Sequence, residues 1–565
     1  MRKNLKTFGS LLLAAAMTVS LAGCGGNSGG GSTQAPAGTT APAASDAGSE
    51  ASTEGAATGA SVSQETDITA AVAVDFTTMD PMDTSDTLSG GIQRMIMDGL
   101  FGFNDKMEII PMLATEYTAN DDATEFVIKL REGVSFTDGT PWNAESAKAN
   151  FDRWGDKTLG LKRTSLLCNI LDKTEAVDDY TLKVTLTQPF GAFINTLAHP
   201  ACVIVSPKVI EAGPEACASN PVGTGQYKFV EWIAGDSTKV ELNKDWWGYD
   251  ADICGGTALA DKDAGFKTVT FRPVSESATR VSMIQSGDAQ VMWTVPTESV
   301  KVLENDPNVT VGTGEGIVVR FLMLNTQKEV FKDKKVRQAI NYALDKNAYV
   351  AVVKNGLASV ATSVIGPATQ FYKANEPYEY NLEKAKELLA EAGYPDGFKF
   401  NMMYSNTTEN QKQAEFYKQQ LAQAGIEVEL IGLENAILNQ RVQDTDAPGA
   451  EAEVDSYISG WSSSTGDADW ALRPLLCKES EPPASYNTCY YENQDFDNLI
   501  YRGLSTADVE VRAQSYAEAQ DIAWEDCPII AMANDFNTWA TSTKITNVSI
   551  YPDGAINIRN GKMSQ

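Results

Sequence analysis

The sequence predicts an α/β protein with more than one domain. Three observations support this class: the length of the chain, the alternation of strand and helix patterns, and helix-strand units in the second half. The chain has 565 residues, of which 43% are hydrophobic, and one hydrophobic core rarely grows beyond roughly 250 to 300 residues. Two or three cores are therefore expected.

The N-terminus has the pattern of a secretory signal. Arg2, Lys3 and Lys6 precede an apolar run over residues 8–21, and small residues lead to Cys24. This arrangement is typical of a signal peptide over residues 1–23 with a lipobox. It predicts a diacylglyceryl thioether on Cys24, which would hold the protein on the outer face of a membrane, at the cell surface or the periplasmic face. An ordinary signal peptide with an incidental cysteine is the alternative.

Residues 24–65 are rich in Gly, Ser, Thr, Ala and Pro and contain no aromatic side chain. Such a segment cannot bury enough apolar surface to offset the entropy of ordering it. We expect a disordered linker that ends at residue 65. No later apolar run approaches the length of a membrane-spanning helix.

Strand and helix patterns follow the linker. Alternation in residues 126–130 and 182–186 predicts half-buried strands. Asp333 is expected to cap one amphipathic helix and Asn381 another, which Gly393 ends. A third helix is expected to end at Gly425 and to run into a strand over residues 426–430.

The charge and the residue counts exclude several functions. The formal net charge is −30, which argues against nucleic acid or an anionic membrane surface as a partner. A single histidine, His199, rules out a Ser/His/Asp triad and a multi-histidine metal site. We expect no cofactor and no metal, a packing role for His199, and ligand binding that is nearly constant between pH 5 and 8.

Seven cysteines remain besides Cys24, without a CxxC pair. Cys477 and Cys489 flank a proline-rich loop at a spacing that a disulfide could close. A bridge between them and a fully reduced set are both open at this stage. The composition leaves three classes of protein: a solute-binding receptor, a secreted carboxylate-dependent hydrolase, and an adhesin.

Five segments share a pattern with one protein family. They are residues 130–141 with 144–148, 221–227, 280–288, 336–339 and 385–393. They resemble the peptide-binding receptors of ABC importers, family 5 of the extracellular solute-binding proteins. Thr137 and Gln226 depart from the pattern, which usually has a larger polar residue and a proline at these positions.

The resemblance implies a two-lobed fold of the large peptide-receptor type, with a subdomain inserted in lobe I and a hinge between the lobes. Lobe I would comprise residues 66–315 and 531–565, with the inserted subdomain at about 109–221, and lobe II residues 316–530. The hinge is expected near residues 315–319 and near Ile530. The lobes would close around a ligand.

Three further groups of residues resemble the glutathione receptors of this family: 459–472 with 482–483, 490–491 and 519–522; 75–81 with 86–89; and 198–201 with 206–207. Where dipeptide receptors have an aspartate for the ligand's ammonium, this chain has Ser462, Ser463, Ser464 and Thr465. Hydroxyls and turn amides suit a carboxylate. The alternative is a solvated polar turn.

The remaining residues are candidates for the ligand site because of the chemistry of their side chains. Trp461 would form an apolar wall, although tryptophan alone is more often core. Asp467 would accept the ligand's ammonium, whereas Asp469 is expected to cap a helix that starts at Trp470.

Arg320 interrupts an apolar run and would bind a ligand carboxylate, with a structural ion pair as the equal alternative. Arg94 and Arg163 are weaker candidates for a second carboxylate, and Asp83 and Thr84 would line the lobe I side. Arg337 is expected to be structural.

The sequence thus predicts a monomeric, lipid-anchored receptor that is not an enzyme. It would capture glutathione or a related small peptide and deliver it to the permease of an ABC importer. A general di- or oligopeptide or other small-solute receptor is the alternative within the family, and a carboxylate-dependent hydrolase the alternative outside it.

Overall fold

The computed structural model describes residues 63–564. The predicted signal peptide, the lipidated Cys24 and almost all of the predicted linker lie outside the described residues. Ser63–Glu65 form a 3-10 turn, η1, and the Ser63 hydroxyl accepts a hydrogen bond from the Met563 N–H at 2.8 Å. The last three residues of the predicted linker therefore form a turn that is hydrogen-bonded to the C-terminal segment.

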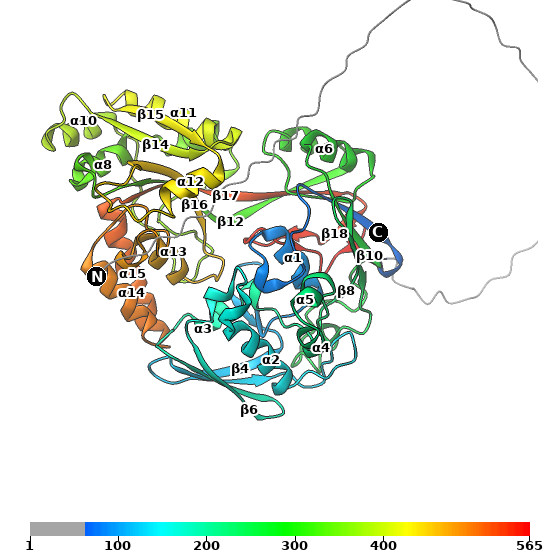
Figure 1. Ribbon diagram of the computed structural model, residues 1–565. Coiled ribbons are helices and arrows are strands. Elements are labelled where there is room, and N and C mark those ends of the chain that lie inside the picture. The colour runs from blue at the N-terminus through cyan, green and yellow to red at the C-terminus, as the bar shows by residue number, and fades with distance from the viewer. Residues whose placement is uncertain (1–62, 565) are drawn as a thin grey trace, which may run out of the picture. The chain divides into compact units, whose positions relative to one another are not determined.

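One large mixed sheet organises the fold (Figure 1). The strands lie in the order β15 (Glu427–Leu433), β14 (Lys399–Ser405), β16 (Ser456–Ser462), β12 (Val309–Leu324), β17 (Ile529–Ser542), β11 (Val291–Trp293), β1 (Asp67–Val72), β10 (Thr268–Pro273), β9 (Ser237–Leu242) and β8 (Tyr227–Ile233). β13 (Ala358–Val360) also pairs with β17. β14 is parallel to β15 and β16, and β1 is parallel to β10 and β11, whereas β12 is antiparallel to β16 and β17.

The long strands β12 and β17 connect the two lobes. The first half of β12 pairs with β17 alone, and its second half lies between β17 and β16. The register of β12 against β17 shifts between Glu315 and Val319, which is where the sequence predicts one half of the hinge. In Figure 1 both strands run as long ribbons between the two ends of the sheet.

A second, four-stranded sheet forms within the predicted inserted subdomain. Its order is β4 (Ala114–Ala119), β5 (Glu125–Leu130), β7 (Thr181–Leu186) and β6 (Leu171–Asp178), all antiparallel. β5 and β7 confirm the two strands predicted by alternation, because Phe126, Ile128, Leu182 and Val184 point into the core. Three two-stranded sheets pair β2 (Phe101–Phe103) with β3 (Ile109–Pro111), β18 (Ile545–Thr546) with β21 (Lys562–Met563), and β19 (Ser549–Ile550) with β20 (Ile556–Asn557).

The helices cover both lobes. On the lobe I side they are α1 (Thr87–Ile96), α2 (Ala144–Gly155), α3 (Phe193–Leu197), α4 (Pro207–Glu211), α5 (Pro214–Ser219), α6 (Ser277–Ser286) and α7 (Val300–Glu304). On the lobe II side they are α8 (Lys334–Ala343), α9 (Lys346–Val352), α10 (Leu382–Glu391), α11 (Thr408–Ala422), α12 (Asn435–Val442), α13 (Asp469–Leu476), α14 (Gln494–Leu504) and α15 (Val509–Asp526).

The predicted helix ends are confirmed by the caps. The Asp333 carboxylate accepts from the Lys335 N–H at the start of α8, and the Asn381 amide oxygen accepts from the Lys384 N–H at the start of α10. Gly393 and Gly425 follow α10 and α11 with φ of 92° and 83°, a left-handed conformation that glycine adopts without strain.

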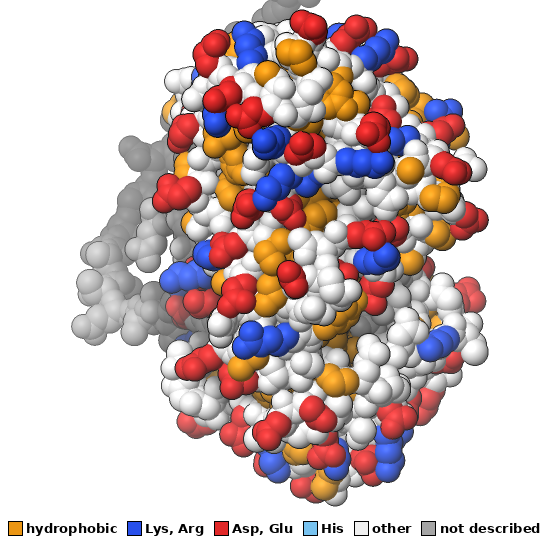
Figure 2. All heavy atoms as spheres, turned by 90° about the vertical axis from the view of Figure 1, so that its left-hand side faces the viewer, with side chains coloured by type: hydrophobic (Ala, Val, Ile, Leu, Met, Phe, Trp, Pro, Cys, Tyr) orange, Lys and Arg blue, Asp and Glu red, His pale blue; other side chains and the backbone are white. Residues whose placement is uncertain are grey.

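Charged side chains are dispersed over the surface. On the face shown in Figure 2, lysines and arginines are interspersed with aspartates and glutamates, and the apolar areas between them are small. Within residues 63–564, no helix is both long and apolar enough to span a membrane.

Candidate functional site

The candidate site is a cavity of about 340 Å³ between the two lobes. From lobe I its wall comes from the segment before α1, the first half of α1, and the turns around Arg163 and His199. From lobe II it comes from the end of β16, the start of α13 and the following loop. The lining residues are Pro81, Thr84, Ser85, Asp86, Thr87, Gly90, Gly91, Gln93, Arg94, Arg163, His199, Pro200, Ala201, Trp461, Ser462, Ser464, Trp470, Tyr486 and Asp553.

The start of α1 faces this cavity, and Asp86 caps the helix there. Its carboxylate accepts from the Ser89 N–H at 2.8 Å and from the Thr77 hydroxyl at 2.9 Å. Gly90 and Gly91 lie one turn later, and the absence of a Cβ at Gly91 leaves room for the ring of Trp293. The wall at this point is therefore backbone and small groups.

Aromatic side chains form the lobe II wall. Trp461 lies near the end of β16 and packs against Tyr486, with 5.1 Å between ring centroids, and against Trp470 at 6.3 Å. The Trp461 indole N–H donates to the Trp470 carbonyl at 2.8 Å. The predicted apolar wall at Trp461 thus comprises three rings, two of which the sequence did not indicate.

The four hydroxyl residues at positions 462–465 lie in different environments. Ser462 and Ser464 line the cavity, whereas the Ser463 hydroxyl donates to the Asp467 carbonyl at 2.6 Å and is buried. Thr465 lines an adjoining cavity of about 850 Å³ that shares Arg163, Trp470 and Tyr486 with the first. Only part of the run can therefore meet a ligand in the smaller cavity.

His199 has the packing role that the sequence predicts, at the edge of the cavity. Its Nδ1 accepts from the Ala201 N–H at 3.0 Å, and its Nε2 lies 3.2 Å from the Ser464 hydroxyl of the other lobe. Burial lowers the pKa of His199 to about 3, and the charges of Arg163 and Arg94 act in the same direction. The imidazole stays neutral at physiological pH and links the two lobes.

Arg163 is the unpaired cation of the cavity. Its Nε donates to the Thr84 carbonyl at 3.0 Å, and one terminal nitrogen lies 3.3 Å from the Ser85 carbonyl. It forms no ion pair with any carboxylate in the part of the chain that the structure describes. Burial lowers its pKa, and the more distant Tyr486 and Asp86 only partly oppose this effect. A guanidinium in this state has capacity left for an anion.

Arg94 is already paired. It lies 2.8 Å from Asp553, and its guanidinium stacks over Tyr551 at 5.6 Å from the ring centroid. Arg94 therefore brings a neutral ion pair to the cavity wall.

Arg320 lies on the opposite face of the sheet. Val319 pairs with Trp461 and Arg320 with Gly460, and successive side chains of a strand point to opposite faces. Because Trp461 lines the cavity, Arg320 points away from it and lies 2.5 Å from Asp535. Burial alone would lower the pKa of Arg320, but Asp535 raises it above its usual value. The prediction that Arg320 binds ligand is corrected in favour of a structural ion pair.

Asp467 and Asp469 also have structural partners. Asp467 is fully buried and pairs with Arg512 at 2.7 Å, so it has no access to a ligand ammonium. Asp469 is the first residue of α13 rather than its cap, and its two carboxylate oxygens accept from Arg473, each at 2.9 Å. The structure thus gives Asp467 an ion pair within its own lobe, and Asp469 does not cap the helix because α13 begins one residue earlier than expected.

The lobe I candidates differ from each other. Thr84 lines the cavity, but its hydroxyl donates to the Asp80 carbonyl and accepts from Gln93. Asp83 is half-buried and lies outside the lining; the Lys162 N–H is 3.4 Å from its carboxylate. Arg337 is structural as predicted, because it donates to the carbonyls of Phe331, Lys332 and Asp526.

The seven cysteines within residues 63–564 are all free thiols. Cys477 and Cys489 are not bridged: the Cys489 thiol donates to the Pro528 carbonyl at 3.2 Å, and burial raises the pKa of both thiols. The possible disulfide between them is therefore absent from the structure. Within the same residues, no group of three or more His, Cys, Asp or Glu side chains is placed to hold a metal.

The fold and the cavity define a two-lobed receptor for a small solute. Residues 108–481 match the family described as bacterial extracellular solute-binding proteins, family 5 Middle. The chain is 38% identical over 489 residues to the glutathione-binding protein GsiB of Escherichia coli (strain K12), which covers 86% of this chain and 92% of GsiB. The chain belongs to this family of solute-binding proteins, and the prediction that it is not an enzyme is confirmed.

Solved structures give the same result for the fold. HbpA2 from Haemophilus parasuis is 26% identical with a TM-score of 0.76, over 88% of this chain and 100% of that one. DppA from Helicobacter pylori, solved with the peptide STSA, is 28% identical with a TM-score of 0.69, over 88% and 99%. The predicted α/β, two-lobed fold is confirmed.

Proposed function

We propose that this protein captures glutathione or a related small peptide in the cavity between its lobes and delivers it to the permease of an ABC importer. The observation that carries the proposal is Arg163, an unpaired guanidinium on the cavity wall opposite three aromatic rings. The likeness to GsiB, a glutathione-binding protein by name, supports the choice of ligand.

The charges of the cavity suit a small zwitterionic peptide. A ligand carboxylate would accept hydrogen bonds from Arg163 and from the Ser462 and Ser464 hydroxyls. An ammonium would lie near Asp86, whose negative charge also faces the cavity. Trp461, Trp470 and Tyr486 would contact the apolar parts between these ends.

The lobe boundaries keep their predicted positions in this proposal, with residues 66–315 and 531–565 in lobe I and 316–530 in lobe II. The register shift in β12 near Glu315 supports a hinge there, because unpaired backbone can change its dihedral angles at little cost. The protein would act as a monomer that closes on one ligand.

The membrane anchor is also part of the proposal. Lipidation of Cys24 would keep the receptor near its permease, because a flexible linker of about 40 residues has a root-mean-square reach of roughly 35 Å. Cys24→Ser should release a ligand-competent protein and impair uptake by cells. Unchanged uptake would show that the anchor only sets the location.

The test of the site is calorimetric titration of glutathione into Arg163→Gln. Loss of a charge-assisted hydrogen bond of about 1.5 to 3 kcal/mol should weaken binding by roughly 13- to 160-fold. Arg320→Gln is the matched control, because it removes an arginine on the other face of the sheet, and its affinity should equal that of the wild type. Equal affinity of Arg163→Gln and wild type would remove Arg163 from the site.

A general peptide receptor is the second candidate. The adjoining cavity of about 850 Å³ shares Arg163, Trp470 and Tyr486 with the first, so a longer peptide that reached it would find additional space. Thermal melting should separate the two candidates: ligand at 100 times its dissociation constant stabilises a protein by about 2.7 kcal/mol. A shift with tetra- and pentapeptides but none with glutathione would favour the general receptor.

A further inference from the structure

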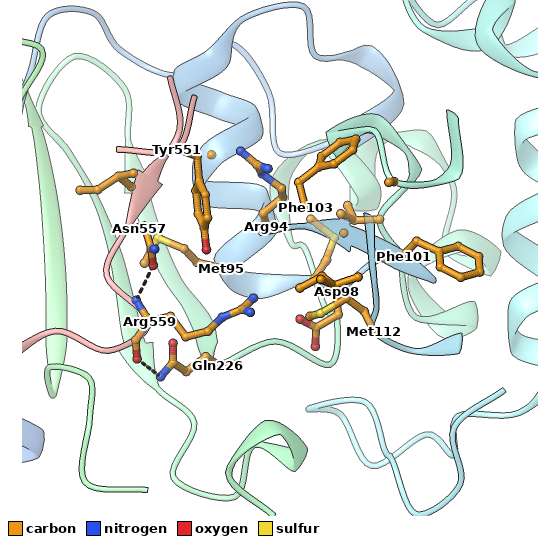
Figure 3. Close-up of a pocket in the computed structure, with 18 of the residues that line it drawn as sticks. Arg94, Met95, Asp98, Phe101, Phe103, Met112, Gln226, Tyr551, Asn557 and Arg559 are labelled. Atoms are coloured by element: carbon orange, nitrogen blue, oxygen red, sulfur yellow. Dashed lines mark hydrogen bonds between the residues drawn. The ribbon is translucent and has the colours of Figure 1, made fainter. Parts of the chain in front are cut away.

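A second, smaller cavity lies within lobe I, beside the second half of α1 (Figure 3). It shares only Gly91 and Arg94 with the interlobe cavity, and it measures about 70 Å³. We call it the lobe I pocket. Its lining residues are Gly91, Arg94, Met95, Met97, Asp98, Gly99, Phe101, Gly102, Phe103, Ile110, Met112, Ala198, Val203, Gln226, Trp246, Tyr551, Ile556, Asn557, Ile558 and Arg559.

Asp98 brings a buried carboxylate to this pocket. The residue is 3% exposed, and its Oδ2 accepts three hydrogen bonds, from the Thr224 hydroxyl at 2.9 Å and from the indole N–H groups of Trp246 at 3.3 Å and Trp247 at 2.9 Å. Its Oδ1 accepts none from residues 63–564. All three donors are neutral, so the negative charge has no cation in contact with it.

The guanidinium of Arg131 lies near enough for its positive charge to interact with the charge of Asp98, but it does not contact the carboxylate. Arg131 donates to the carbonyls of Met112 and Ile253, each at 2.6 Å, and forms no ion pair with Asp98. A buried carboxylate with a free oxygen is costly unless a donor or a positive charge meets it. Asp98 Oδ1 is therefore a position for an ammonium group.

Arg559 faces Asp98 across the pocket, and the two side chains point toward each other in Figure 3. Its guanidinium stacks on Trp246, at 5.3 Å from the ring centroid, and it forms no ion pair with a carboxylate of the described residues. The pocket thus presents one cation and one anion to each other with a gap between them.

Gln226 fixes the segment that carries Arg559. Its Nε2 donates to the Arg559 carbonyl at 2.9 Å and to the Tyr249 hydroxyl at 2.8 Å. This is one of the two positions where the chain departs from its family pattern, which has proline there. A proline has no side-chain amide to make these bonds, so the hydrogen bond that holds the Arg559 backbone depends on Gln226.

The remaining side chains that line the pocket are apolar or already have an ion-pair or hydrogen-bond partner. Met95, Phe101, Phe103 and Met112 supply soft, apolar surface. Arg94 is paired with Asp553. The side chain of Asn557 accepts from the Arg559 N–H at 3.2 Å.

We propose that the lobe I pocket is a second ligand site, for a free α-amino acid with a small apolar side chain. The ammonium would meet Asp98 Oδ1, the carboxylate would meet Arg559, and the side chain would contact the methionine and phenylalanine wall. At about 10 to 15 Å³ of such volume for each water-sized group, the pocket takes about five to seven atoms. This matches alanine or 2-aminobutyrate, whereas valine is one atom larger than the upper limit.

The test is calorimetric titration of the full chain with L-alanine, L-2-aminobutyrate and L-valine, with intrinsic tryptophan fluorescence, to which Trp246 contributes, as a second signal. Propionate lacks the ammonium and isobutylamine lacks the carboxylate, so both should bind at least tenfold more weakly than the best amino acid. A saturable, one-to-one signal is expected. If none of the three amino acids gives such a signal up to 10 mM, on the order of the weakest useful affinity, the pocket holds only water and the proposal is overturned.

Two variants of the pocket test where the amino acid binds. Asp98→Asn keeps an acceptor for Thr224, Trp246 and Trp247 and turns an uncharged amide toward the pocket, so affinity should fall at least tenfold. Arg559→Gln should do the same, and it keeps the proposal testable if Asp98→Asn fails to fold. Asp252→Asn, an exposed aspartate outside the pocket, is the matched control and should bind as the wild type does.

Arg163→Gln separates this site from the interlobe cavity. It should weaken glutathione and leave amino-acid binding unchanged, whereas Asp98→Asn should do the reverse. If Arg163→Gln abolishes amino-acid binding and Asp98→Asn retains it, the amino acid occupies the interlobe cavity, and the lobe I site is excluded whatever the outcome for glutathione.

Discussion

Arg163 and Arg320 have the same side chain and opposite surroundings. Arg320 has Asp535 at 2.5 Å, so a ligand carboxylate would have to displace an existing partner. Arg163 has only backbone carbonyls, so a ligand carboxylate would add an interaction without breaking an ion pair. At the scale of single residues, the local partner decides which arginine is available for binding.

His199 should make stability, but not ligand affinity, depend on pH. Its pKa is about 3 in the folded protein and about 6.5 in an unfolded chain. The unfolded state therefore binds a proton below pH 6.5 that the folded state does not, and stability is lost as the pH falls. Between pH 8 and 5 the loss amounts to about 2 kcal/mol.

Urea unfolding of wild type and His199→Gln at both pH values measures this effect. The wild type should lose about 2 kcal/mol more than the variant, and the glutathione affinity of the wild type should be the same at pH 5 and pH 8. Equal losses in the two proteins would show that His199 is protonated in the fold.

The buried pair of Asp467 and Arg512 should be a stability determinant. The side chains are 0% and 4% exposed, and removing one partner of such a pair leaves an uncompensated charge at a cost of about 3 to 5 kcal/mol. Asp467→Ala should lower the free energy of urea unfolding by that amount. Asp152→Ala, which breaks the exposed pair with Lys148, should cost less than about 1 kcal/mol.

At the scale of elements, strand pairing decides which side chains face the cavity. β12 and β16 are antiparallel with Val319 opposite Trp461, and this register places Trp461 and Arg320 on opposite faces. A shift by one residue would exchange the two faces. Both strands can be predicted from their own residues, but their register depends on residues more than a hundred positions apart.

The cap of α10 gives a prediction at this scale. The Asn381 side chain satisfies the Lys384 N–H, and replacing such a cap by alanine costs about 1 kcal/mol. Asn381→Ala should lower the free energy of unfolding by that amount and leave glutathione affinity unchanged, because α10 does not line the cavity. Lys386→Ala, at an exposed position in the middle of α10, should change stability by less than about 0.5 kcal/mol.

At the scale of the whole molecule, four hydrogen bonds among residues 63–564 join the subdomain of lobe I to lobe II, one of them from the Thr506 hydroxyl to the Asp121 carbonyl at 3.2 Å. The Gly191 N–H donates to the Leu504 carbonyl at 2.7 Å, the Asn195 amide to Gln370 at 2.9 Å, and His199 lies 3.2 Å from Ser464. These contacts lie beside the interlobe cavity. They are expected to stabilise the closed arrangement together with the ligand.

Gln370→Ala should therefore increase the rate of glutathione release. Loss of one neutral hydrogen bond of about 0.5 to 1.5 kcal/mol corresponds to roughly 2- to 13-fold, which stopped-flow displacement can measure. Gln411→Ala, on the exposed side of α11, is the control. Identical release rates for the two variants would mean that the hydrogen bond between Gln370 and Asn195 does not stabilise the closed arrangement.

The sequence by itself determined the α/β class, the strands β5 and β7, and the caps of α8 and α10, because hydrophobic periodicity and capping act over a few neighbouring residues. The family pattern extended this to the two-lobed fold. Tertiary structure alone decided that Arg163 rather than Arg320 faces the cavity and that Asp467 forms an ion pair with Arg512. It also placed Gln226 beside Arg559 in the lobe I pocket. These choices depend on strand register and on the pairing of buried charges between segments far apart in the chain, which no local pattern records.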